Sequence, residues 1–182
     1  MEHLIVASLA PTMLLPFMVL RRVKVTPSLA LSDHIAKTKV TIWYGRVLIT
    51  LATVLVAAWF YGWYAPTYDI DLVLQLLVGI VCLTAGGAGL VPSIKGKLSG
   101  KIHQSLAWTY AGILPVLIFW WAAIENNLVT KSIIVGCLSI QLSMILFFLF
   151  YKSAKRYFLY FQLSYIALFG IVLFAIAYPP SY

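Results

Sequence analysis

Residues 132–178 read SIIVGCLSIQLSMILFFLFYKSAKRYFLYFQLSYIALFGIVLFAIAY. Two apolar runs, 132–151 and 158–178, flank a short linker that holds three basic residues. A helix of about 20 apolar residues is long enough to cross the hydrocarbon core of a bilayer. This stretch therefore predicts two antiparallel membrane helices that are joined by a basic turn.

The rest of the chain repeats this pattern. Of its 182 residues, 63% are hydrophobic and only 10% are charged, and the mean hydropathy is +0.97. A soluble domain carries about 25% charged residues. We therefore predict one domain over 1–182, an all-α bundle of six membrane helices in three hairpins. The predicted spans are 4–20, 40–62, 72–91, 105–124, 132–151 and 158–178.

The first apolar run is short and contains Pro11 and Pro16. Both are tolerable in a membrane helix if neighbouring helices satisfy the carbonyls that proline leaves free. A tilted or partly interfacial segment is the alternative. Positive charges follow this run, whereas a secretory signal carries them before it. We therefore expect a retained span.

The charged residues predict the orientation of the bundle. Eleven of the 13 basic residues lie in the first, third and fifth connections, and four of the five acidic residues lie at the opposite end. Because positively charged loops stay inside, both termini are predicted outside and three basic hairpins inside. All six tryptophans fall near predicted span ends, as in an aromatic belt. Topology accounts for the net charge of +8, so nucleic acid is not a predicted partner.

Four basic residues are candidates for binding anionic lipid. Arg46 lies inside the second predicted span, close after Trp43. It can extend to the lipid head groups, or it can bind a lipid phosphate or another anion between helices. Lys95, Lys97 and Lys101 lie between the third and fourth spans, where each attracts anionic lipid by about 1 kcal/mol.

Two histidines map to the basic end of the predicted bundle. His34 follows Asp33 in the first connection, and His103 lies near the start of the fourth span. We expect both histidines to have a structural role or to lie at the membrane interface. One alternative is a reactive, hydrogen-bonded group of Asp33, His34 and His103 that acts as acid and base. Another is a haem held by His34 and His103; no other cofactor is predicted. No H-E-x-x-H motif or cysteine cluster indicates a metal site.

Small and uncharged polar residues predict contacts between helices. Ala85, Gly86 and Gly89 near the end of the third span allow another helix to approach closely. Gln141 and Gln162 are expected at comparable depth in the last two spans. They predict an interhelical hydrogen bond worth about 0.6–2 kcal/mol. Lining a polar cavity is the alternative for both glutamines.

Three short motifs resemble those of a known family. Residues 87–92 read GAGLVP, residues 100–103 read GKIH, and residues 32–35 read SDHI, where Ser or Asp is expected to cap a short interfacial helix. The pattern resembles a large family of six-helix prokaryotic membrane proteins that is known only as a domain of unknown function. The resemblance implies the fold and a prokaryotic cytoplasmic membrane, but no activity. In that family these loops face outward, whereas the basic residues of this chain predict that they face inward.

Three classes of function follow from these patterns. We favour an accessory or structural subunit of a membrane complex, or a lipid-binding scaffold, whose partners are anionic membrane lipids, other membrane subunits or a second copy. The first alternative is a small homo-oligomeric transporter or channel, which needs a polar path through the spans. The second is a membrane-embedded, lipid-modifying enzyme that uses the inner-face histidines. Since no catalytic motif is recognisable, an enzyme is the less favoured hypothesis.

Overall fold

The computed structural model describes residues 3–94 and 96–179, and this part of the chain is helical without strands. The long helices are α1 (His3–Leu20), α3 (Lys39–Trp59), α5 (Leu72–Leu90), α6 (Leu98–Ile124), α7 (Leu128–Phe150) and α8 (Phe158–Ala177). The short elements are α2 (Leu31–Ile35), the π-helical turn η1 (Phe60–Tyr64), α4 (Ala65–Thr67) and the 3-10 helix η2 (Lys152–Tyr157).

Six helical stretches are long and apolar enough to cross a membrane. They are α1, α3 continued through η1 and α4, α5, α6, α7, and η2 continued into α8. The prediction of an all-α bundle with six spans is confirmed. The chain is therefore a multi-pass helical membrane protein.

Several spans are longer than predicted. The second extends to Thr67 rather than residue 62, and α6 begins at Leu98 rather than residue 105. The predicted limits followed the apolar run, but the polar residues at the start of α6 are also helical. A helix continues into the interfacial region wherever its backbone hydrogen bonds are satisfied, so the apolar run sets only a minimum length.

The first span is a continuous helix. Pro11 and Pro16 both lie within the 18 residues of α1, and Pro11 is buried. The hydroxyl of Ser8 donates to the Ile5 carbonyl, and that of Thr12 donates to the Ser8 carbonyl, so these polar side chains are satisfied within the helix. Because α1 packs against α3 and α8, it is a full member of the bundle.

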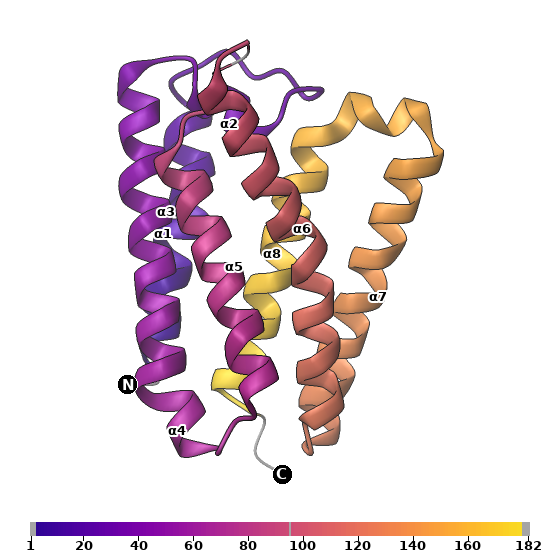
Figure 1. Cartoon of the computed structure of the whole chain (residues 1–182). Helices are drawn as coiled ribbons and strands as arrows, with labels where there is room; N and C mark the ends of the chain where they lie inside the picture. The colour runs from indigo at the N-terminus through magenta and orange to yellow at the C-terminus, as the bar shows by residue number, and fades with distance from the viewer. Residues whose placement is uncertain (1–2, 95, 180–182) are drawn as a thin grey trace.

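The start of α1 and the end of α8 lie at the lower end of the bundle in Figure 1, while the first, third and fifth connections lie at the upper end. Nδ1 of His3 lies 3.0 Å from the hydroxyl oxygen of Tyr178, which joins α1 to the end of α8. We call the upper end the basic end and the lower end the terminal end.

The terminal half of the bundle has a tightly packed aromatic core. Trp59 and Phe60 meet Tyr64 and Trp121 there, with ring centroids 4.9 Å apart for Trp59 and Tyr64 and 6.1 Å apart for Phe60 and Trp121. Both tryptophans are fully buried. The predicted aromatic belt is thus wrong for these two, because position along a span fixes the depth of a residue but not its face. Trp43 on α3, in contrast, is 60% exposed.

Candidate functional site

A cavity of about 830 Å³ extends from the basic end into the bundle. All six spanning stretches contribute to its lining. Small-molecule sites typically occupy about 300–1,000 Å³. The cavity is therefore large enough for a small organic ligand or part of a lipid.

The cavity does not extend into the aromatic core. Its deepest lining residues include Ser8, Val56 and Leu173, whereas Trp59 and Trp121 do not line it. Those two tryptophans belong to a cluster of buried side chains from α3, α5, α6, α7 and α8. Among the described residues, the cavity lining therefore stops short of the aromatic core of the terminal half.

The cavity also opens sideways. Trp108 and Gly112 on α6 and Leu149 on α7 line it and yet are exposed, Trp108 by 58% and Leu149 by 68%. Figure 1 shows α7 diverging from α6 towards the upper end. Since these exposed residues belong to spanning helices, the side opening faces the surrounding lipid.

One wall of the cavity is aromatic. The ring of Phe148 on α7 contacts two rings on α8. Its centroid lies 4.9 Å from that of Phe158 and 5.0 Å from that of Phe161. Tyr165 extends this wall, and its hydroxyl donates a hydrogen bond of 2.8 Å to the Ala111 carbonyl of α6. The wall offers apolar surface to a ligand and at the same time ties α8 to α6.

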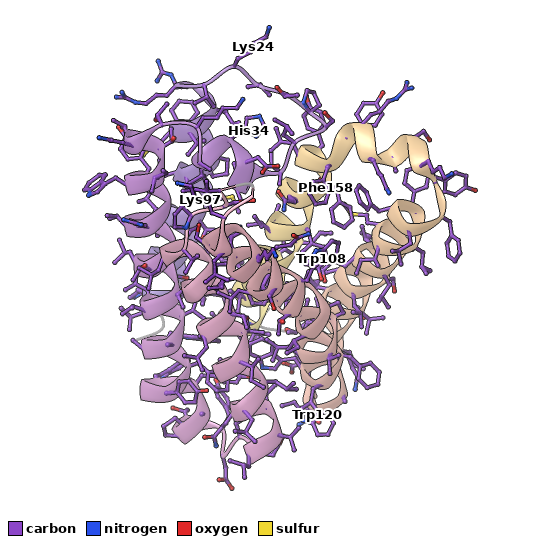
Figure 2. All side chains as sticks on the ribbon, turned by 45° about the horizontal axis from the view of Figure 1, so that its top comes forward. Lys24, His34, Lys97, Trp108, Trp120 and Phe158 are labelled. Carbon is purple, nitrogen blue, oxygen red and sulfur yellow. The ribbon has the colours of Figure 1, made fainter. Side chains whose placement is uncertain are left out.

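The mouth of the cavity is polar and lies at the basic end. Figure 2 shows Lys24, His34 and Lys97 gathered at that end and Trp120 at the other. Segments that are far apart in the sequence meet around the cavity, including all three that carry the family resemblance, 32–35, 87–92 and 100–103. The polar lining residues there are Ser32, Asp33, Ser93, Lys97, Lys101, His103, Gln104 and Gln162.

His103 and Arg46 hold the end of α5. Nδ1 of His103 lies 2.9 Å from the Ala88 carbonyl oxygen and 2.8 Å from that of Val91. Because carbonyl oxygens only accept hydrogen bonds, this nitrogen carries the proton. Nε of Arg46 donates to the Leu90 carbonyl oxygen at 3.1 Å. The two side chains thus satisfy carbonyls that a helix end leaves free.

His34 has a structural environment. It is fully buried, its Nδ1 lies 2.8 Å from the Ala30 carbonyl oxygen, and its Nε2 accepts the backbone N–H of Thr26 at 3.0 Å. Both ring nitrogens are therefore engaged, and haem binding would require His34 to release one of these bonds. In the described residues, His34 is hydrogen-bonded to neither Asp33 nor His103, so the predicted reactive group is not assembled.

The short interfacial helix forms, but its cap differs from the prediction. Ala30 is the N-cap of α2, and Ser32 and Asp33 lie inside the first turn. The carboxylate of Asp33 reaches back to accept the Ala30 N–H at 3.2 Å. A carboxylate in the first turn can satisfy the free N–H groups as well as a cap residue does.

Each glutamine makes a hydrogen bond between helices, but to a backbone group and not to the other glutamine. Gln141 joins α7 to α8, the predicted pair, whereas Gln162 joins α8 to α2. Oε1 of Gln162 accepts the backbone N–H of Leu31 at 2.7 Å, and Nε2 of Gln141 donates to the Tyr165 carbonyl at 3.3 Å. They are not bonded to each other. Only Gln162 lines the cavity; Gln141 is buried, and its Oε1 has no hydrogen-bond partner in the described structure.

The small residues of α5 lie at close contacts or at the cavity. A Cβ added to Gly89 would come within 2.6 Å of Cγ2 of Ile49 on α3, and one on Gly86 would lie 3.4 Å from Cγ2 of Thr53. Ala85 lines the cavity.

Of the predicted lipid-binding residues, Lys97 and Lys101 line the mouth, Arg46 does not, and Lys95 lies outside the described residues.

The aromatic wall was not predicted from the sequence. Phe158, Phe161 and Tyr165 have the spacing of one helix face, which was a usable signal. Gly100 was not predicted either, and an added Cβ there would overlap the Ile94 carbonyl oxygen. Only glycine fits at position 100, because the backbone of the preceding turn packs directly against this residue of α6.

Comparison with known protein families, with curated proteins and with solved structures found no match to this chain. The family resemblance therefore stays a prediction, and the geometry of the cavity carries the functional argument.

Proposed function

We propose that this membrane protein is a lipid-binding scaffold that holds an amphiphile with a phosphate head group, in the simplest case a membrane phospholipid, in the cavity between its helices. The observation that carries this proposal is the division of the cavity lining. Apolar and aromatic side chains form the walls, whereas Lys97 and Lys101 lie at the mouth. An amphiphile has the same division between its chain and its head group.

The energies favour such a ligand. Each methylene group that moves from water into an apolar site gains about 0.8 kcal/mol, although a chain that comes from the bilayer gains only the difference in packing. Each lysine near the membrane surface adds about 1 kcal/mol for an anionic head group. The head-group contacts therefore decide which lipid stays bound, and the side opening gives the chain access from the bilayer.

The packing of the terminal half favours binding over transport. A transporter needs a polar path through the membrane, but the described cavity lining stops short of Trp59 and Trp121 in the terminal half. Both side chains are fully buried in the structure described here. The described lining therefore favours a ligand that enters and leaves from the basic half.

We further propose that the basic end faces the cytoplasm, which places the bound head group in the inner leaflet and both termini outside. The support is the gathering of basic connections at one end of the bundle. Single cysteines at Lys24 and Asn126, labelled with a membrane-impermeant maleimide in intact cells, test this orientation. Labelling at Lys24 and not at Asn126 would overturn it.

Replacement of the mouth lysines tests the proposed function. The double variant Lys97→Gln/Lys101→Gln should retain less phospholipid through purification in mild detergent, by about thirtyfold for two charges at about 1 kcal/mol each. The matched control is Lys152→Gln/Lys155→Gln, which removes two exposed charges from η2 that do not line the cavity. Equal lipid loss in both double variants would contradict the proposal.

A further inference from the structure

The mouth of the cavity contains one carboxylate among the described lining residues. Asp33 of α2 shares this end with Lys97 and Lys101. It is only partly exposed, and no lysine or arginine within the described part of the chain forms an ion pair with it. In the described part of the chain its carboxylate accepts the Ala30 N–H, at 3.2 Å from Oδ2. A carboxylate that could have paired with the mouth lysines therefore stays free of them.

A purely anionic head group makes no use of such a carboxylate. A negative charge in the binding site lowers the affinity for an anionic ligand, so it selects against such ligands. A head group that carries both a phosphate and a protonated amine uses both charges. The lysines then face the phosphate, and Asp33 faces the ammonium group.

Two further groups at the mouth have unused hydrogen-bonding capacity. Oε1 of Gln162 is taken by the Leu31 N–H, and its amide nitrogen has no protein partner among the described residues. Nε2 of His103 is likewise without a described partner, since only Nδ1 contacts the end of α5. Both side chains line the cavity. They add polar contacts for a head group at the mouth, His103 from α6, which also carries Lys101, and Gln162 from beside α2.

We infer that the cavity selects a zwitterionic phospholipid of the phosphoethanolamine type, with Asp33 as the residue that recognises its ammonium group. This inference rests on the proposed function, because it names the class of lipid that the same cavity takes. A residue that only stabilises α2 would not affect lipid choice.

The variant Asp33→Asn separates the two roles of this residue. Asparagine keeps an oxygen that accepts the Ala30 N–H, so α2 is preserved, but it removes the negative charge. The control is Asp69→Asn, which removes a carboxylate at the terminal end; Asp69 has a φ of 48°, which asparagine tolerates.

The experiment uses the full chain in nanodiscs made of equal parts of phosphatidylethanolamine and phosphatidylglycerol with the same acyl chains. After release into mild detergent, native mass spectrometry counts each bound lipid. We expect Asp33→Asn to shift the bound ratio towards phosphatidylglycerol by about fivefold relative to the wild type and to Asp69→Asn. Thermal unfolding should show the same midpoint for Asp33→Asn and the wild type.

An unchanged ratio in a stably folded Asp33→Asn variant overturns the inference. The proposed function would still stand in that case, provided that Lys97→Gln/Lys101→Gln reduces the total bound lipid. If the wild type retains neither lipid, the proposed function fails, and this inference fails with it.

Discussion

Nε of Arg46 on α3 donates a hydrogen bond of 3.1 Å to the carbonyl oxygen of Leu90, the last residue of α5. Carbonyls in the last turn of a helix have no partner in the helix itself. A cation at this position also interacts favourably with the helix dipole. The one basic residue inside a predicted span therefore has a partner within the protein.

Replacement of Arg46 distinguishes this structural role from lipid binding. Arg46→Gln should lower the stability by about 1 kcal/mol, because glutamine is shorter and uncharged. Thermal unfolding in detergent measures the change, and Arg46→Lys, which keeps the charge, should lose less. Arg46 lies outside the cavity lining, so the cavity lipid should be unaffected. Loss of anionic lipid at an unchanged unfolding midpoint would instead assign Arg46 to a lipid phosphate.

His34 is expected to be essential for the first connection. His34→Ala removes two hydrogen bonds and leaves a space in a fully buried site, which should cost about 2–4 kcal/mol. Unfolding by titration with sodium dodecyl sulfate measures this loss. His3→Ala is the control, since His3 is exposed and forms one side-chain bond. Equal stability of the two variants would show that the described contacts of His34 contribute little.

Because both ring nitrogens of His34 are hydrogen-bonded, we predict that the protein does not bind haem through this residue. Haem added to the purified protein should not give the absorbance of a bis-histidine complex, because His34 offers no free nitrogen. Optical titration measures this directly. A bis-histidine spectrum that His34→Ala or His103→Ala abolishes would contradict the structure of the first connection.

Asp71 should make the stability depend on pH. The indole N–H of Trp120 and the backbone N–H of Leu74 donate to its carboxylate and lower its pKa. A lowered pKa in the folded protein means that the contribution is complete above the unfolded value of about 3.9 and is lost as the pH falls through the folded value. Asp71→Asn still caps α5 but does not titrate.

The wild type should therefore unfold at a higher temperature than Asp71→Asn near neutral pH, and this difference should vanish on acidification. Thermal unfolding of both proteins between about pH 7 and pH 2 measures it. Other acidic residues titrate in both proteins, so the difference isolates Asp71. A difference that stays constant over this range would show that the Trp120 contact does not stabilise the charged form.

The number of spans was predictable because bilayer thickness sets a minimum length for each apolar run. The contacts were less predictable. Trp59 and Trp121 lie at span ends, as expected, but on inward faces that depend on how the helices rotate in the bundle. Gln141 and Gln162 both join different elements, but through backbone groups that no sequence spacing identifies.

The cavity itself could not be predicted from the sequence. It depends on the divergence of α7 from α6 and on the docking of the first connection against α8, where the Leu159 N–H bonds to the Pro27 carbonyl. These are properties of packing between distant segments. The residue types at the mouth were recognised in part, since Asp33, His103, Lys97 and Lys101 were candidates and a polar cavity was the alternative for Gln162. Only the fold shows that all five line the same cavity.

Filling the cavity tests its role in lipid binding most directly. Gly112 lines the cavity, and a Cβ added there meets no other atom within 4 Å; Gly136 on α7 is equally open but lies outside the lining. We predict that Gly112→Trp retains less than about half of the phospholipid per protein that Gly136→Trp and the wild type retain, as counted by native mass spectrometry after purification in mild detergent. Equal lipid on folded Gly112→Trp and Gly136→Trp would contradict the claim that the cavity holds the lipid.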